Sequence, residues 1–498
     1  MLPYNPKSSQ SIVTFAKELK HKTLRGACDK GTVFKKIDGK GGFGIFLEKY
    51  YFKYTPNSDP RPDFPDAEPG GGLELKSTGL SSYNSKKGFK IKERLALKNI
   101  NFNEVYKYSF LDSSLYKKAK GLLLVFYIWD NKIKPEDQLI RLVDAWSIPQ
   151  EDMQFIVHDY NLINNKIKAG LAHELSGKDT TYLEAATTGE GHGSKTTQPF
   201  SQIKAPPRRY AFKGSYMNYI LSNIVLEKYD KKEQSYFKEC IKRYQNLKPI
   251  KRSKEKESLS LEGLIDSQLN KYYGCSEFEI AKELNVDYKL NKYNRPDKAF
   301  YARVVKKILS GYEEGIAELV KADITLKAVR IEENNMPKQH MSHPAFRFID
   351  DVFKIEWEES KWSEIIQKKY LFVFFKIHKD GYYVLEKFLI WSMPQADIDE
   401  CKKIWLKTKE LISSGGVFNS FVYKKNGDLK LTKKGNPYKN NNFPKPGESE
   451  VCHVRPKGKD ASDVFPLPVK DKKLKVMEYS KQCFWLNSSY VGNIYQHK

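Results

Sequence analysis

Hydrophobic and polar residues alternate along this chain with two periods, and these periods predict a succession of helices and strands. A 3.6-residue spacing over 11–24 brings Ile12, Phe15, Ala16 and Leu19 to one face, which predicts an amphipathic helix. A second helix is expected over 45–52, after a glycine-rich turn at 40–44. The same criteria predict strands at 73–76, 121–129 and 142–148, a partly strand-like segment at 91–105, and a helix over 151–168 that ends at Gly170.

The pattern is repeated in the second half of the chain. Trp146-Ser147-Ile148-Pro149-Gln150 recurs as Trp391-Ser392-Met393-Pro394-Gln395. The run from Lys120 to Phe126 matches the run from Lys369 to Phe375, and Phe15 to Leu19 matches Ile280 to Leu284. Three matches in the same order indicate two copies of one fold, with loops of different length.

One strand carries candidate chemistry. In Leu73-Glu74-Leu75-Lys76, the two-residue period places Glu74 and Lys76 on one face and both leucines on the other. Asp63 or Asp66, brought back by the glycine turn, would add a second carboxylate, and two carboxylates can hold Mg²⁺ at a phosphodiester. Lys76 would orient the attacking water, and Glu48 would face the same site. The alternative interpretation is a solvated edge strand with a surface ion pair.

The repeat allows the two copies to be compared at this strand. Leu73-Glu74-Leu75-Lys76 aligns with Ile324-Thr325-Leu326-Lys327, so the second copy keeps the lysine but has Thr325 in place of the carboxylate. No acidic residue lies between 298 and 312, where the counterpart of Glu48 is expected. The second copy is therefore expected to bind rather than to catalyse.

Charge and composition indicate the class of partner. The formal net charge is +25, from 86 basic and 61 acidic residues, which favours a polyanion such as a phosphate backbone. The longest apolar run, 121–129, is too short to span a bilayer, and the start of the chain lacks the core of a signal peptide. Six scattered cysteines with no Cys-x-x-Cys pair indicate neither zinc nor disulfides, which fits a reducing cytoplasm.

The expected organisation is two domains joined by a charged segment. The first copy spans 1–227, the charged linker 228–260, and the second copy 261–498. Within the linker, 249–258 is predicted to be a solvated hinge. The segment 433–450, rich in Lys, Asn, Gly and Pro, is predicted to be a mobile loop.

Taken together, these segments resemble a known family, the mismatch-repair nicking endonuclease MutH and the related GATC-cutting type II restriction endonucleases of the Sau type. The similarity runs over nearly the whole chain. It is carried by 44–48, Pro62-Asp63, 73–76, 172–176, 198–204, 452–456 and 481–485. The resemblance implies an α/β (α+β) architecture of two tandem restriction-endonuclease-like domains, each a mixed sheet flanked by helices, which form a pseudo-dimer.

The resemblance also implies roles for individual residues. Asp63 and Glu74 would bind the divalent metal, Lys76 would position the water, Glu48 would assist, and Lys118 would complete the catalytic site. The interval from Asp63 to Glu74 is longer than the spacing usual in the family. Asp66 therefore remains an alternative metal ligand.

Residues for reading DNA follow from the same resemblance. The Arg-Pro-Lys turn of the repair enzyme is present in the second copy as Arg455-Pro456-Lys457, whereas the first copy has Thr187-Thr188-Gly189. Arg455 and Lys457 would contact guanine or phosphate, and Thr187 and Thr188 would lie at the corresponding turn. Phosphate contacts are expected from Arg208, Arg209 and Lys213. The methyl-sensing aromatic of the repair enzyme aligns with Ala211, which favours a restriction role.

The expected function is that of a bacterial, cytoplasmic type II restriction endonuclease. It would cut double-stranded DNA at GATC with Mg²⁺ and leave 5′-phosphate ends. The second copy would bind another site and promote dimerisation on DNA, because one catalytic centre cannot cut both strands of a palindrome at once. The alternatives are a repair-type nicking endonuclease and a non-cleaving DNA-binding regulator.

Overall fold

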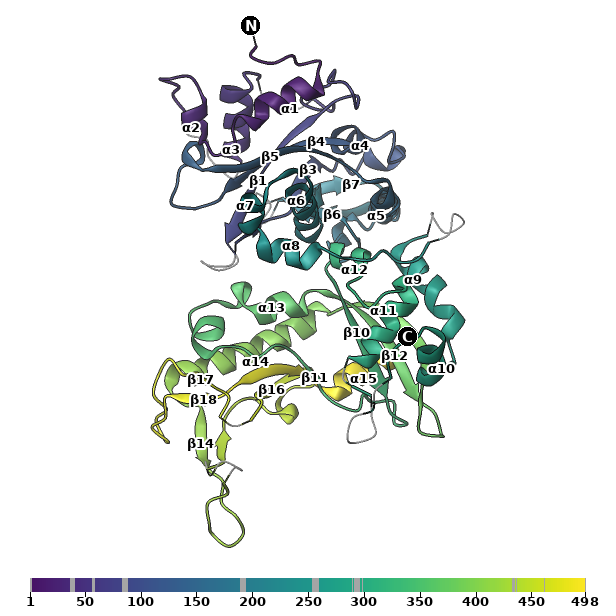
Figure 1. The fold of residues 1–498 in the computed structure, drawn as a ribbon, viewed down its shortest axis with the longest axis vertical. Helices are drawn as coiled ribbons and strands as arrows, with labels where there is room; N and C mark the ends of the chain where they lie inside the picture. Colours follow the sequence, from purple (N-terminus) through teal and green to yellow (C-terminus); the bar gives the residue numbers. More distant parts are fainter. Residues whose placement is uncertain are drawn as a thin grey trace. The chain divides into compact units, whose positions relative to one another are not determined.

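The computed structural model describes residues 2–35, 41–55, 59–82, 88–188, 194–252, 259–288, 290, 296–297, 299–431, 435, 437–460 and 462–497. The chain divides into two compact units (Figure 1). Unit 1 comprises Met1–Ile265 and Glu314–Asp323, and unit 2 comprises Asp266–Glu313 and Ile324–Lys498. Both units mix helices and sheets, so the fold is of the mixed α/β class.

A four-stranded sheet of order β2-β1-β4-β5 forms the centre of unit 1. Its strands are β1 (Glu74–Ser82), β2 (Phe89–Ile91), β4 (Gly121–Ile128) and β5 (Ile140–Ser147). β4 is parallel to β1 and antiparallel to β5, whereas β2 pairs with β1 only at Leu80–Ser82. On the edge of β1 opposite β4, the first half of the strand is therefore not paired with β2.

Apolar side chains pack helices against one face of this sheet. α1 (Ser9–Lys17) contacts β5, and its Ile12 and Ala16 are fully buried. α3 (Gly42–Phe46) and the π-helical turn η1 (Leu47–Tyr51) join the same core as Leu73 and Leu75. This packing confirms the predicted alternation at the start of β1, in which the leucines face the core.

A second, smaller sheet in unit 1 has the order β3-β9-β6. The remaining elements of unit 1 are α2 (Leu24–Ala27), β3 (Leu95–Asn99), η2 (Val105–Lys107), α4 (Ser114–Ala119), η3 (Pro135–Asp137), α5 (Gln150–Lys168), η4 (Ala172–Glu174), β6 (Leu183–Thr187), β7 (Thr196–Gln198), β8 (Ser201–Ala205), β9 (Arg208–Phe212), α6 (Gly214–Lys228), α7 (Lys231–Ser235), α8 (Lys238–Tyr244) and α12 (Ala317–Lys321). α9 (Leu261–Leu269) begins in unit 1 and ends in unit 2.

Unit 2 has a central sheet with the same strand relations. β10 (Ile324–Ile331) is parallel to β12 (Lys369–Ile377), which is antiparallel to β13 (Tyr383–Ser392). α14 (Gln395–Ser414) follows β13 as α5 follows β5, and a proline precedes each helix. Leu122 pairs with Glu74 and Trp146, and Tyr370 pairs with Thr325 and Trp391. Thr325 thus occupies the position of Glu74, while Lys369 corresponds to Gly121 rather than to Lys120.

A second sheet in unit 2 has the order β11-β19-β16. The remaining elements of unit 2 are η6 (Asn270–Tyr272), α10 (Glu277–Glu283), α11 (Phe300–Ser310), β11 (Met341–Ser342), η7 (Phe348–Phe353), η8 (Trp357–Glu359), α13 (Lys361–Ile366), β14 (Phe418–Phe421), β15 (Lys439–Asn441), η9 (Pro446–Glu448), β16 (Cys452–Pro456), β17 (Val464–Pro466), β18 (Glu478–Ser480), β19 (Gln482–Leu486) and α15 (Ser488–Gln496). Among the described residues, no helix has the length and apolarity needed to cross a membrane.

The segment 228–260, predicted as a charged linker, is largely folded. α7 and α8 lie within it and belong to unit 1. Phe237, Cys240 and Tyr244 are buried, and so is Glu233, although the charged residues of this segment suggested a linker. Of the predicted hinge 249–258, residues 253–258 lie outside the described residues, and Ile250 is buried.

The predictions for one loop and two helices also change. In the segment 433–450, predicted as a mobile loop, β15 pairs with β14, and η9 follows it; residues 433, 434 and 436 lie outside the described part. The helix expected over 45–52 begins at Gly42 and continues as a π-helical turn, whereas Lys40 of the preceding turn lies outside the described part. The helix expected over 11–24 ends at Lys17.

Candidate active site

The loop before β1 closes on itself and delivers Asp63 to the start of the strand. Phe64 and Leu73 exchange two backbone hydrogen bonds of 3.0 Å. Gly72 has a φ of +114°, and a Cβ there would lie 2.5 Å from Cγ of Pro62, so this close turn requires glycine. The long interval between Asp63 and Glu74 in the sequence thus forms a closed loop.

Within this turn, Asp63 rather than Asp66 lies beside Glu74. The backbone N–H of Leu75 donates to Oδ2 of Asp63 at 2.8 Å, and the N–H of Asp63 donates to Oε2 of Glu74 at 3.2 Å. Asp66 is exposed. The geometry therefore favours Asp63 as the second carboxylate.

Glu74 is the centre of a buried charge cluster. Its side chain is only 2% exposed, and its Oε1 accepts a hydrogen bond from Nζ of Lys76 at 2.6 Å. Nζ of Lys118 donates to both carboxylate oxygens at 3.1 Å. Lys118 comes from α4, which leads into β4, the parallel neighbour of β1. The alternative of a solvated edge strand with a surface ion pair is therefore wrong.

The pKa values of two acidic groups near Glu74 are raised by burial and by neighbouring carboxylates. Burial raises the pKa of Glu48 to about 7, and the charge of Asp63 adds to the effect while Lys76 opposes it. Burial also raises the pKa of Asp63, and the charge of Glu74 adds to that shift. The cluster therefore concentrates carboxylates in a place where their ionised forms need a compensating cation.

The raised pKa of Glu48 gives a testable pH dependence. Below about pH 4.5, Glu48 is protonated in both the folded and the unfolded chain. Between pH 4.5 and about 7, Glu48 loses its proton in the unfolded chain but keeps it in the folded one. The stability of the fold therefore falls as the pH rises through this window. Glu48→Gln removes this loss. In metal-free urea unfolding, we expect the variant to gain about 1–3 kcal/mol over the wild type between pH 5 and 8. A difference that does not change with pH would contradict the burial of this charge.

Two residues near the cluster, Tyr54 and Lys98, were not predicted from the sequence. The hydroxyl of Tyr54 is buried with no hydrogen-bond partner among the described residues; burial raises its pKa, and the charge of Asp63 adds most to this shift. Lys98 is half-buried on β3, which packs against α4. Burial lowers the pKa of Lys98, Lys118 acts in the same direction and Glu74 opposes it. Neither residue lies in a recognisable motif, and only the fold brings them near the cluster.

The corresponding position in unit 2 is cationic. Thr325 replaces Glu74, and burial lowers the pKa of Lys327, with Lys457 adding to the effect. Burial lowers the pKa of His343 to about 3, and the charges of Lys327 and Lys457 contribute. The segment Glu314–Asp323, which precedes β10 as the Asp63 loop precedes β1, folds into unit 1 instead. Among the described residues of unit 2, no equivalent of the Asp63–Glu74 pair lies at this strand.

The predicted DNA-binding residues of unit 1 gather on its second sheet. Thr187 pairs with Arg208 at one end of β6 and β9, and Thr188 follows directly. Gly189 lies outside the described residues. The Nε groups of Arg208 and Arg209 are buried and have no hydrogen-bond partner in the described part of the chain, so a phosphate at the surface would have to contact the other nitrogens of these two guanidinium groups.

Lys213 is used differently from the other predicted phosphate contacts. Its ammonium group donates to the carbonyl of Thr180. Burial lowers the pKa of Lys213, while the charge of Asp159 opposes the shift. A contact between Lys213 and DNA would require these internal interactions to break. Ala211, on the same strand, is fully buried.

In unit 2, the Arg-Pro-Lys turn lies at the end of β16. The guanidinium of Arg455 lies 5.5 Å from the ring centroid of Trp485, and both Arg455 and Lys457 are exposed. Nζ of Lys457 donates to the carbonyl of His343 at 2.6 Å and to Oγ of Ser342 at 3.1 Å. Arg455 is thus more accessible to a ligand than the ammonium group of Lys457.

The carboxylates of unit 1 fit a hard divalent cation. No group of three or more His, Cys, Asp or Glu side chains in the described part of the chain is arranged to hold a metal. A pair of carboxylates is nevertheless sufficient for Mg²⁺, which retains several waters and takes further oxygens from a phosphate. Asp63 and Glu74 form such a pair, and burial, with the charge of Glu74 adding to it, raises the pKa of Asp63.

Comparison with known proteins agrees with this geometry. Residues 52–159 match the family described as DNA mismatch repair enzyme MutH, a range that contains Asp63, Glu74, Lys76 and Lys118. The chain is also 28% identical over 484 residues to the Type II restriction enzyme Sau3AI of Staphylococcus aureus, covering 91% of each protein. The mixed α/β architecture is consistent with a MutH-like restriction-endonuclease fold. The chain is therefore similar to MutH and to Sau3AI, and together these similarities support a site-specific deoxyribonuclease.

Proposed function

We propose that this type II restriction endonuclease hydrolyses double-stranded DNA at GATC with Mg²⁺ and leaves 5′-phosphate ends. The observation that carries the proposal is the buried cluster in which Lys76 and Lys118 contact Glu74 while Asp63 lies beside it. The net charge of +25 supports a phosphate backbone as the ligand. The GATC sequence rests on the resemblance of the motifs in both halves of the chain.

Each residue of the cluster has a distinct part in the reaction. Asp63 and Glu74 would hold the metal, and when bound it would neutralise charge at the phosphate and lower the pKa of water. Lys76 orients the attacking water through its ammonium group, and Lys118 stabilises negative charge on a phosphate oxygen. The water oxygen bonds to phosphorus as the bond from phosphorus to O3′ breaks, and a proton passes to the O3′ leaving group.

Digestion of a fully sequenced genome followed by sequencing of the ends tests this proposal. With Mg²⁺ we expect every fragment end to carry a 5′-phosphate and to lie within or beside GATC, and we expect no cleavage in excess EDTA. Ends at another sequence would overturn the specificity, and cleavage that persists in EDTA would overturn the metal requirement.

Unit 2 is proposed to be a catalytically silent copy that binds a second DNA site. It keeps Lys327 in the strand but has Thr325 at the position of Glu74, and it carries the Arg455-Pro456-Lys457 turn. Since the described residues of the two central sheets contain one such carboxylate pair, at β1, cutting both strands of a palindrome needs a second chain or sequential nicking. Occupation of unit 2 would favour the assembly of two chains on DNA.

The double change Arg455→Ala with Lys457→Ala tests the role of unit 2. Loss of base or phosphate contacts costs about 1–3 kcal/mol each, so we expect cleavage of two-site DNA to slow by about tenfold or more. The full chain is used, because unit 1 includes Glu314–Asp323. Lys379→Ala with Lys472→Ala, two exposed lysines of unit 2, is the matched control. Equal rates for both double variants would count against a DNA-binding unit 2.

A repair-type nicking activity is the second candidate, favoured by the family match and by the single carboxylate pair in unit 1. The two functions differ in their products. Preference for hemimethylated DNA with nicks in one strand would support the repair activity. Efficient double-strand cleavage of unmethylated DNA is expected for restriction.

A further inference from the structure

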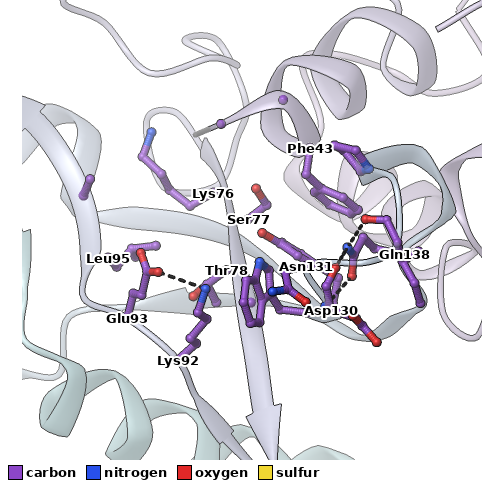
Figure 2. A pocket seen from close by; sticks show the side chains of 18 of the residues that line it. Phe43, Lys76, Ser77, Thr78, Lys92, Glu93, Leu95, Asp130, Asn131 and Gln138 are labelled. Atoms are coloured by element: carbon purple, nitrogen blue, oxygen red, sulfur yellow. Dashed lines mark hydrogen bonds and ion pairs between the residues drawn. The ribbon is translucent and has the colours of Figure 1, made fainter. Parts of the chain in front are cut away.

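A pocket of about 550 Å³ in unit 1 shares Lys76 with the carboxylate cluster (Figure 2). Its floor is the part of β1 from Lys76 to Gly79, where β2 does not pair with the strand. One wall consists of 92–96, and the other contains Phe43, Tyr127 and Trp129. The pocket therefore lies next to the place where a scissile phosphate at Lys76 would sit.

Lys92 and Trp129 are fixed against each other across β1. The N–H of Lys92 donates to the carbonyl of Gly79 at 3.0 Å, and the N–H of Trp129 donates to the carbonyl of Leu80 at 2.9 Å. Nζ of Lys92 lies 3.0 Å from the ring centroid of Trp129, a cation–π contact. A Cβ at Gly79 would lie 3.0 Å from Cβ of Trp129, so glycine allows this close packing. The indole thus holds the ammonium group of Lys92 at the pocket.

The charges in the pocket suit a phosphate better than an apolar ligand. Nζ of Lys92 lies 3.2 Å from Glu93, whose side chain is 58% exposed, and such exposed pairs are weak. Arg94 adds a second cation, paired with Glu184 at 3.1 Å. A phosphate can replace the exposed Glu93 at Lys92 through a charge-assisted hydrogen bond. Because Lys92 already covers the ring of Trp129, that aromatic face is not open for a stacked base.

We propose that this pocket binds a phosphate of the cut strand that neighbours the scissile one, with Lys92 as its main ligand, Arg94 as a second cation, and Trp129 as the positioning residue for Lys92. This inference rests on the proposed nuclease function. It gives unit 1 a grip on the DNA backbone beside the reacting bond, without reading any base.

Lys92→Met tests the phosphate contact in the full chain. With GATC duplexes and Mg²⁺, we expect KM to rise about tenfold with little change in kcat, and the slope of log affinity against log salt to fall by about 1. Lys92→Arg should keep most of the affinity. Lys168→Met, at an exposed lysine of α5, is the control. An unchanged KM and salt slope for Lys92→Met would overturn the proposal.

Trp129 is tested as a positioning residue with two variants. Trp129→Ala should raise KM as Lys92→Met does, whereas Trp129→Phe, which keeps an aromatic face, should restore it. Combining Trp129→Ala with Lys92→Met should add little, because both remove the same contact. Fully additive effects would overturn the positioning role, and Lys92→Met alone keeps the test valid should Trp129→Ala fail to fold.

Substrates with a single methylphosphonate, which has no charge, identify the phosphate. At one position beside the scissile phosphate, neutralisation should cost the wild type about tenfold in affinity but cost Lys92→Met almost nothing. Equal costs for both proteins at every position would overturn the inference. A wild type that does not cleave unmodified DNA would overturn the proposed function instead, so the two failures are distinct.

Discussion

Glu74→Gln abolishes DNA cleavage, with an expected loss of at least about 10³-fold in kcat, equivalent to about 4 kcal/mol of transition-state stabilisation. The amide has the shape of the carboxylate but no charge, so it cannot balance Lys76 and Lys118 or help to hold a divalent cation. The measurement is single-turnover cleavage of a plasmid with one GATC site. DNA binding without divalent metal should be retained or become tighter, since a negative charge is lost beside the phosphate.

The control for this variant is Glu227→Gln, the same change at an exposed acid of α6. It should cleave at the wild-type rate. Lys327→Met and Lys76→Met form a second comparison, because both lysines occupy the same position in the two central sheets. Only the change at Lys76 should slow cleavage strongly. Normal cleavage by Glu74→Gln would remove the basis of the proposed active site.

The central sheets were predictable because their sequences are locally consistent. The alternation at 73–76 and the apolar run at 121–129 correspond to β1 and β4, and the helix expected over 151–168 is α5 with one residue added. In each case side-chain period, turn residues and helix stops agree within a short window. The internal repeat added the relation between Glu74 and Thr325, which depends only on aligned sequence.

Elements whose burial depends on distant residues were not predictable. α7 and α8 have enough charged residues to suggest a linker, yet Phe237 and Cys240 are buried in unit 1. α12 packs with unit 1 although it lies between segments of unit 2. Nothing in the local pattern of either segment indicates which core it will join, because that choice is made by contacts with other elements, such as those of α8 with β2 and of α12 with α6.

The residues of the active site also fall into a group that the sequence pattern predicts and a group that it does not. Asp63, Glu74 and Lys76 are close in sequence, so strand alternation and a glycine turn bring them together. Lys118 followed only from the resemblance, because its position depends on the parallel pairing of β4 with β1. Lys92 and Trp129 meet only across Gly79, and neither is part of a motif.

The α12 segment has an energetic consequence for unit 1. Nζ of Lys321 lies 2.7 Å from Oδ1 of Asp152 on α5, and the two side chains are 4% and 1% exposed. The hydroxyl of Tyr216 donates to the other oxygen of Asp152 at 3.0 Å. A chain that ends before Glu314 would leave Asp152 without its lysine. Unit 1 is therefore completed by residues that follow the first segment of unit 2, Asp266–Glu313, in sequence.

Lys321→Met should destabilise the protein by about 3–5 kcal/mol, because it leaves the charge of Asp152 buried and unpaired. For a unit of this size the melting transition of unit 1 should fall by roughly 6–15 °C. Asp152→Asn added to Lys321→Met removes the charge and keeps an acceptor for Tyr216, so it should recover a large part of the loss. Lys168→Met, at an exposed lysine of the same helix as Asp152, should change little. A double variant no more stable than Lys321→Met alone would show that lost packing, rather than an uncompensated charge, sets the cost.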